Sequence, residues 1–230
     1  ALMVLLTSII LGLCMGSGVV FSQLYGAKRE TDLRISIANA FVLILIVSAL
    51  LCILAYLLLD QLLIWLQIPE EAYHHAKEYL SVIFSGILFV FLYNFFAAVL
   101  RSVGNTVIPL LILAVSALTN IGLDLAFILL FDMGVKGAAW ATVAAQGVSA
   151  LCVILYFFYR EKEVCPRKEH LHYRKDLLVF IMTNASLTAV QQSIMNFGIL
   201  LVQGLVNSFG FAASAAFAAV VKIDAFAYMP

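Results

Sequence analysis

Long apolar stretches alternate with short polar ones along the whole chain. Each apolar stretch is about as long as the roughly 20 helical residues that cross the hydrocarbon core of a bilayer. The pattern predicts membrane-spanning helices at about residues 1–25, 35–59, 79–100, 107–131, 135–159, 177–206 and 211–230. The sequence starts within an apolar stretch, without an initiator Met, and stops within another, so we expect a fragment of a longer protein.

Composition agrees with this pattern. Hydrophobic residues make up 64% of the chain and charged residues only 11%, whereas soluble domains carry roughly 25% charged residues. The chain is therefore predicted to be all-α, a polytopic helical bundle that crosses the cell (plasma) membrane several times.

The 13 basic and 13 acidic side chains are distributed unevenly between the loops. Basic residues gather after the first, third and fifth stretches: Lys28, Arg29, Arg34, Arg101, Arg160, Lys162, Arg167, Lys168, Arg174 and Lys175. The intervening loops carry mostly acids: Glu70, Glu71, Glu78 and Asp132, with Lys77 and Lys136. The positive-inside rule predicts that the basic loops lie together on the cytoplasmic side. Neither the neutral overall charge nor the short basic loops support a nucleic-acid partner.

One polar segment, residues 160–176, is much longer than the other loops and contains Pro166 near its middle. It is predicted to be a cytoplasmic linker between two helical lobes. Residues 1–159 would form most of the first lobe, and residues 177–230 the start of the second. Transporters are often built from two such related halves.

Small residues occupy positions where helices need to approach closely. Gly12, Gly16 and Gly18 lie in the first stretch, and Gly137 lies in the fifth among several alanines. Small side chains let membrane helices pack backbone against backbone. We expect these residues to serve packing.

Histidine and cysteine form no recognisable catalytic or metal-binding pattern. His170 and His172 are predicted to lie in a solvated part of the linker, and His74 and His75 in an ordinary outer loop. The four cysteines are far apart, as expected of packing residues. No HExxH, nucleophile-elbow, phosphate-loop or dinucleotide pattern occurs on a suitable element, so the chain is not expected to be an enzyme.

The most informative polar pair lies in the fourth stretch, where Asn120 and Asp124 are four residues apart. That spacing puts both on one helical face, about 6 Å apart. An ionised carboxylate near the bilayer centre costs roughly 2.5 to 3.5 kcal/mol, so an acid retained there usually has a function. Carboxylate and amide oxygens suit a proton, Na+ or a cationic substrate group. The alternative is that Asp124 only satisfies a polar partner between helices.

The next stretch carries a second polar pair, Thr142 and Gln146, again four residues apart and on one face. The Thr142 hydroxyl could ligate a cation or donate a hydrogen bond to a carboxylate, and Gln146 could do the same one turn further along. A hydrogen bond between helices is the more common role for either residue alone.

The last two stretches contain further polar residues. Together with Gln146, the following are candidates for a substrate pocket: Asn184, Gln191, Gln192, Asn196, Lys222 and Asp224. Lys222 and Asp224 are two residues apart and point to different sides of a helix. An ion pair between helices would account for these two equally well.

Four strings occur in an ordered set: RSVGNTVIP at 101–109, NIGLD at 120–124, GAAWAT at 137–142 and KIDAFAYMP at 222–230. With this set the chain resembles the multidrug and toxic compound extrusion (MATE) family over essentially its whole length. The resemblance implies twelve helices in two six-helix lobes, with this chain running from the second helix to the eighth. It also implies that small amphipathic or cationic organic compounds are exported by alternating access, driven by inward movement of Na+ or H+.

The resemblance also implies a set of site residues. In one branch of the family, a cation site in the amino-terminal lobe uses an Asp on the first helix, an Asn and an Asp on the fifth, and a Thr on the sixth. The last three look like Asn120, Asp124 and Thr142, and the first-helix Asp lies outside the expected fragment. No cofactor other than the coupling ion is implied, and the protein is expected to function as a monomer in the lipid bilayer.

Two other functions remain open at this point. A flippase for lipids or lipid-linked saccharides in the same superfamily would be expected to have a more cationic cavity, and only Lys222 suggests one. A membrane scaffold or membrane-embedded enzyme with incidental polar residues is the third interpretation. It has no catalytic constellation to support it.

Overall fold

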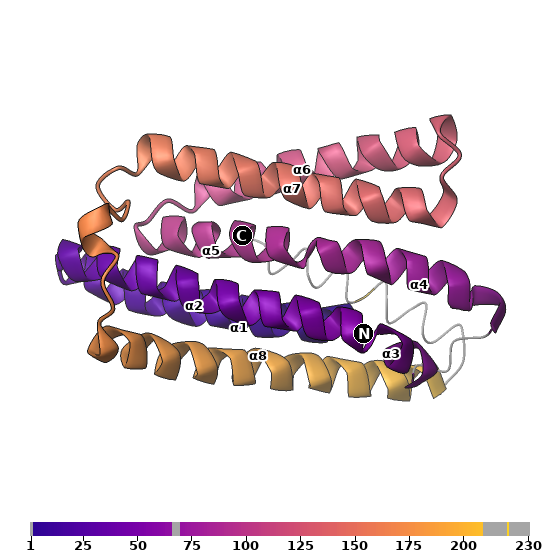
Figure 1. The fold of residues 1–230 in the computed structure, drawn as a ribbon, viewed down its shortest axis with the longest axis horizontal. Helices are drawn as coiled ribbons and strands as arrows, with labels where there is room; N and C mark the ends of the chain where they lie inside the picture. The colour runs from indigo at the N-terminus through magenta and orange to yellow at the C-terminus, as the bar shows by residue number, and fades with distance from the viewer. Residues whose placement is uncertain (1, 66–69, 209–219, 221–230) are drawn as a thin grey trace.

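The computed structural model describes residues 2–65, 70–208 and 220, and within these it contains helices and turns but no strand (Figure 1). The elements in chain order are α1 (Leu2–Gly26), α2 (Glu30–Leu57), α3 (Leu59–Trp65), α4 (Glu70–Ser85), α5 (Ile87–Ser102), α6 (Val107–Leu125), a π-helical turn (Ala126–Leu130), α7 (Gly134–Arg160), a 3₁₀ turn (Lys168–His170) and α8 (Lys175–Ser208). The long helices lie roughly side by side in one bundle (Figure 1).

Six spans of the described chain are long and apolar enough to cross a membrane. They cover Thr7–Gly26, Glu30–Leu57, Ala76–Ser102, Val107–Leu130, Gly134–Arg160 and Lys175–Ile199. These confirm six of the seven helices predicted from the apolar pattern. The seventh, at 211–230, lies outside the described residues.

Phenylalanine rings on α5 form the centre of the core. The Phe95 ring lies 6.1 Å from Phe21 of α1 and 5.4 Å from Phe41 of α2, measured between ring centroids. The neighbouring Phe96 ring lies 5.1 Å from Phe157 of α7. Aromatic pairs at such separations add to the energy of area burial. Two neighbouring rings of α5 therefore contact α1, α2 and α7, and α5 is the buried centre of the bundle.

Helices α1 and α8 approach each other at two glycines. A Cβ atom at Gly12 would lie only 2.3 Å from the Cα of Ala189, and one at Gly16 only 2.5 Å from the Cα of Ala185. Both pairs are spaced four residues apart, so small residues on one helix meet small residues on the other. This confirms the packing role predicted for Gly12 and Gly16.

The acidic end of the bundle is more helical than predicted. His74 and His75, expected in a loop, lie in the first turns of α4, so that prediction is wrong. The reason is that these turns are polar and extend beyond the apolar stretch. Asp60 of α3 accepts a hydrogen bond from Tyr73 at 2.9 Å and pairs with Lys77 at 2.5 Å. The Lys77 and Tyr73 bonds hold the pKa of Asp60 below its ordinary value.

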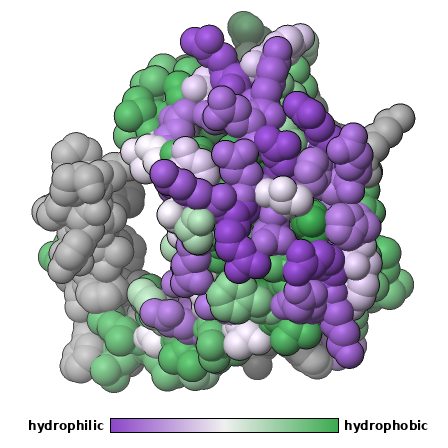
Figure 2. Space-filling view, turned by 90° about the vertical axis from the view of Figure 1, so that its left-hand side faces the viewer, coloured by the Kyte–Doolittle hydropathy of each residue, from purple (hydrophilic) through white to green (hydrophobic). Residues whose placement is uncertain are grey.

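The three basic loops lie together at the opposite end, as predicted. Arg34 donates from Nε to the Glu163 carbonyl at 2.7 Å, which joins the first basic loop to the linker. Asn105 donates to the Tyr156 hydroxyl at 3.0 Å, which joins the loop after α5 to the end of α7. Figure 2, which looks onto this end, shows a broad hydrophilic surface with hydrophobic side chains around its edge.

Part of the linker folds back onto the protein. His170 is only 8% exposed, and its Nδ1 accepts a hydrogen bond from the Arg167 backbone N–H at 3.1 Å. The prediction of a solvated loop is therefore wrong for His170, although His172 is exposed. A 3₁₀ turn ending at His170 turns its ring inward, which no sequence pattern indicated.

Candidate cation site

Asn120 and Asp124 lie on the same face of α6, both half-buried. The Asn120 Nδ2 and Asp124 Oδ1 atoms are inaccessible to solvent, and neither has a hydrogen-bond partner among the described residues. Buried polar atoms are nearly always hydrogen-bonded, so each exception needs an explanation. Two such atoms on one helical face mark a place where a bound ligand would supply the missing polar contacts.

Three other buried side-chain atoms also lack a partner within the described residues, and all three lie on α2. They are Ser36 Oγ, Asn39 Nδ2 and Ser48 Oγ. These belong to neutral groups, whereas Asp124 can carry a charge. Since an unpaired carboxylate is far more expensive to bury than an unpaired amide or hydroxyl, α6 is the stronger candidate for a cation. The polar residues on α2 were missed at the sequence level, because isolated Ser and Asn are common in membrane helices.

A π-helical turn, Ala126–Leu130, begins two residues after Asp124. The Phe131 backbone N–H donates to the Ala126 carbonyl at 3.2 Å, which is the five-residue spacing of a π-helix. Such turns are rare and often occur at functional sites. Here the turn directly follows the part of α6 that carries the carboxylate.

A hydrogen bond between α6 and α7 fixes how the two helices are aligned. Ser116 donates to the Ala145 carbonyl at 2.8 Å. The helices run antiparallel, so four residues forward from Ser116 on α6 corresponds to four residues back from Ala145 on α7. Asn120 therefore lies level with Ala141 and its neighbour Thr142, and Asp124 lies one turn further along.

Thr142 is half-buried, and its hydroxyl donates to the Ala138 carbonyl one turn earlier in α7, at 3.0 Å. A hydroxyl in this state keeps its oxygen lone pairs, so it can still act as an acceptor or cation ligand. Within the described residues no hydrogen bond joins Thr142 to Asn120 or Asp124. Asn120 and Thr142 thus lie at one level of the α6–α7 pair and Asp124 lies one turn further along, with no direct hydrogen bond among the three in the described structure.

The Gln146 side chain contacts Gly86 and not the candidate cation site. A Cβ atom at Gly86, between α4 and α5, would lie 2.6 Å from the Gln146 Oε1. The side chain of Gln146 therefore rests against the interruption between these two helices. Its place in a substrate pocket stays a prediction.

The polar series on α8 is divided in its contacts. Asn196 donates to the Ser8 hydroxyl of α1 at 2.5 Å, so it links two helices. Asn184 donates to the Phe180 carbonyl within α8 at 2.9 Å. Gln191 is exposed and Gln192 is half-buried. The remaining two pocket candidates, Lys222 and Asp224, lie outside the described residues.

An aromatic hollow of about 400 Å³ lies where the chain turns from the end of α6 into α7. It is lined by Phe127, Phe131, Met133, Trp140 and Ala144. Phe127 follows Asp124 by three residues, and Trp140 precedes Thr142 by two. Aromatic faces attract organic cations. This hollow was not anticipated from the sequence, because its walls come from the π-helical turn, the loop after it and α7.

Known proteins resemble this chain in both sequence and fold. The sequence profile of the MatE family matches residues 1–126, more than half of the 230 residues. A "Probable multidrug resistance protein YpnP" of Bacillus subtilis (strain 168) is 31% identical over 224 residues, which cover 97% of this chain and 50% of that protein.

Solved structures match the fold of almost the whole chain and cover about half of their own length. One, described as the outward-facing conformation of a multidrug resistance MATE family transporter of the MOP superfamily, has a TM-score of 0.86 at 21% identity and covers 98% of this chain and 50% of its own. An inward-facing conformation, described in the same terms, has a TM-score of 0.77 at 22% identity. It covers 94% of this chain and 49% of its own. The chain spans about half the length of the relatives it matches. By sequence, fold and membrane-spanning helices, this chain is a multi-pass membrane protein that belongs to the MatE family.

Proposed function

We propose that this chain acts in the export of small amphipathic or cationic organic compounds across the plasma membrane, by alternating access coupled to inward movement of Na+ or H+. Asp124 is the carboxylate that binds and releases the coupling ion. Asn120 and Thr142 contribute neutral oxygens beside it. No other cofactor takes part, and the transporter works as a monomer.

The observation that carries the proposal is the pair of buried, unpartnered atoms on α6, Asn120 Nδ2 and Asp124 Oδ1. Rotating the Asn120 amide exchanges its nitrogen and oxygen, so that its oxygen can face a cation beside Asp124. A bound Na+ or proton would neutralise the carboxylate and satisfy the oxygen that has no partner. Hard oxygen donors of this kind suit Na+ and do not select soft metals.

Coupling follows if the loaded and empty sites favour different packings of α6 and α7. A ligand shifts a conformational equilibrium only by its differential affinity for the two states. The hydrogen bond from Ser116 to the Ala145 carbonyl joins α6 to α7 before the site, and the π-helical turn follows the site. Both features support a local rearrangement of α6 when the carboxylate changes its charge.

The relatives favour drug export over the other transport function considered. The Bacillus subtilis relative is named as a multidrug resistance protein, and one from Staphylococcus saprophyticus, 27% identical over 167 residues, as a multidrug export protein. Neither name refers to lipid flipping. The aromatic hollow beside α6 also suits a flat organic cation better than a saccharide headgroup.

The decisive variant is Asp124→Asn, which removes the charge and keeps the shape. We expect gradient-driven export of a fluorescent organic cation by the full-length protein in liposomes to fall to the level of protein-free liposomes. The Na+ gradient and the pH gradient are imposed in separate experiments. The gradient that drives export by the unmodified protein identifies the coupling ion.

Asp132→Asn is the matched control, because it makes the same chemical change on an exposed residue in the turn before α7. Asp132 has a positive φ of 51°, a conformation that Asn adopts readily. We expect its export to be unchanged. Export by Asp124→Asn equal to that of the control, at equal amounts of reconstituted protein, would exclude Asp124 as the coupling carboxylate.

A further inference from the structure

A hollow between α1 and α5 lies away from the candidate cation site, near the basic end of the bundle. Its volume is about 220 Å³. Met15 and Val19 of α1 form an exposed apolar wall, and Gly18 and Ala98 form a floor where the two helices approach closely. Arg101, in the last turn of α5, is the one charged side chain among the described residues that line the hollow.

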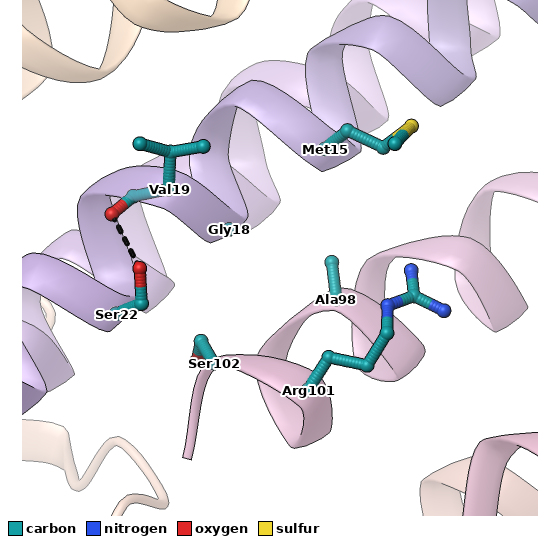
Figure 3. A pocket seen from close by; sticks show the side chains of 7 residues that line it. All are labelled: Met15, Gly18, Val19, Ser22, Ala98, Arg101 and Ser102. Atoms are coloured by element: carbon teal, nitrogen blue, oxygen red, sulfur yellow. Dashed lines mark hydrogen bonds between the residues drawn. The ribbon is translucent and has the colours of Figure 1, made fainter. Parts of the chain in front are cut away.

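The direction of Arg101 is informative. In Figure 3 its side chain passes Ala98 and carries the guanidinium toward the Met15 end of the hollow, while Ser22 and Ser102 lie at the other end. Met15 is further than Ser22 from the end of α1 at Gly26, and hence deeper in the membrane span. The charge is therefore turned back toward the hydrocarbon and away from the polar surface.

Arg101 makes no ion pair or side-chain hydrogen bond with any residue in the described part of the chain. Other arginines at this end are paired: Arg29 with Asp32 at 2.7 Å, and Arg174 with Asp32 at 2.6 Å. A guanidinium offers five donors arranged to hold a phosphate or carboxylate by two bonds. Next to an apolar wall, and paired with no carboxylate of the described residues, these donors fit an anion that comes with its own apolar part.

Ser22 and Ser102 at the outer end of the hollow add a second requirement for the ligand. Ser22 donates to the Val19 carbonyl at 2.8 Å, and Ser102 donates to the Val99 carbonyl at 2.6 Å. Their protons are used, but their oxygens can still accept hydrogen bonds. The hollow therefore presents donors at its deeper end and acceptors at its outer end. A phosphate carrying a hydroxylated headgroup has the complementary arrangement.

We propose that this hollow binds the headgroup of an anionic glycerophospholipid such as phosphatidylglycerol. The phosphate lies on the Arg101 guanidinium, and the glycerol hydroxyls donate to Ser22 and Ser102. The acyl chains leave over Met15 and Val19 toward the membrane interior. Basic pockets between membrane helices on the cytoplasmic side are a recognised means of holding such headgroups.

The test is native mass spectrometry of the full-length protein with equal amounts of phosphatidylglycerol and phosphatidylcholine. The unmodified protein is expected to keep one phosphatidylglycerol in preference to phosphatidylcholine. Arg101→Gln should weaken this adduct at least about tenfold, because hydrogen bonds to a charged phosphate exceed the diffuse attraction of one interfacial cation. Arg160→Gln removes the same charge from the last turn of α7, outside the hollow, and should weaken the adduct roughly fivefold at most.

Two labelling experiments test where the ligand binds and whether it is a lipid. Phosphatidylglycerol should slow maleimide labelling of Val19→Cys, and adding Arg101→Gln should abolish that protection. Glycerol 3-phosphate, which lacks acyl chains, should give no protection at the same concentration. If Arg101→Gln is not monodisperse, Ser22→Leu replaces it. This variant keeps the Arg101 charge and fills the outer end of the hollow with an apolar side chain. The phosphatidylglycerol adduct should then be lost.

Three results would overturn the proposal. One is equal loss of phosphatidylglycerol in the Arg101 and Arg160 variants, which would mean diffuse attraction only. Another is protection of Val19→Cys by glycerol 3-phosphate as strong as that by the lipid, which would mean a site for soluble anions. The third is a Val19→Cys that does not react in detergent alone, which would mean that another part of the protein covers the hollow.

Discussion

At the residue scale, polar side chains in apolar helices are the features that a sequence reveals best. Asn120 and Asp124 stand out because an acid in hydrocarbon is costly, and the structure leaves one buried atom of each without a partner among the described residues. Ser116 did not stand out, since its partner is the backbone carbonyl of Ala145 on another helix. A backbone carbonyl has no sequence signature, so such a bond becomes visible only in the fold.

Ser116→Ala tests this bond. We expect a loss of about 0.5 to 1.5 kcal/mol in the free energy of unfolding, because the α6–α7 pair loses a buried hydrogen bond. Ser149→Ala is the matched control: Ser149 is also buried, but it donates to the Gln146 carbonyl of its own helix. Denaturant titration of the full-length protein in detergent measures both. An equal loss in the two variants would show that the interhelical bond contributes nothing specific.

At the element scale, apolar length predicted the membrane spans well and the helix ends poorly. Helix α2 begins at Glu30, about five residues before its apolar stretch, with Glu30 and Asp32 in its first turn. Acidic side chains stabilise a helix N-terminus through its dipole, so the helix extends beyond the membrane into polar sequence. The same reason explains why residues 70–78 are helical although their composition suggested a loop.

The α1–α8 contact gives a prediction for an element. Gly12→Ala and Gly16→Ala should each destabilise the protein by about 1 to 3 kcal/mol, because the added methyl group meets the α8 backbone, which cannot move aside as a side chain can. Gly122→Ala is the control, since a Cβ there meets nothing within 4 Å. Thermal unfolding in detergent measures all three. A melting temperature for Gly16→Ala as high as that for Gly122→Ala would contradict the close contact.

At the scale of the whole molecule, the basic loops do more than orient the chain. Asp32, at the start of α2, pairs with Arg29 nearby and with Arg174 before α8, which is 142 residues away in sequence. Its side chain is 17% exposed and that of Arg174 is 35% exposed. The first basic loop is therefore joined to the start of α8, where the predicted second lobe begins.

A double-mutant cycle on this pair tests the link. Asp32→Asn, Arg174→Gln and their combination should give a coupling energy of about 0.5 to 1 kcal/mol, since the pair is only partly shielded from water. The coupling should decrease as salt is added. The cycle for Glu30 and Arg34, which are 3.9 Å apart with Glu30 72% exposed, should give a value near zero. Equal coupling in the two cycles would show that Asp32 and Arg174 form no special contact.

The sequence alone determined the class of this protein. Apolar length and loop charge predicted a multi-pass helical bundle with its basic loops at one end, because the bilayer imposes length and charge rules on each segment separately. The cost of a buried acid likewise singled out Asp124. Only the tertiary structure decided which surfaces meet: Gly12 and Gly16 against α8, Gln146 against Gly86, and Arg101 in a hollow beside α1. Such contacts depend on how helices are rotated and aligned, and each is set by packing over many residues at once.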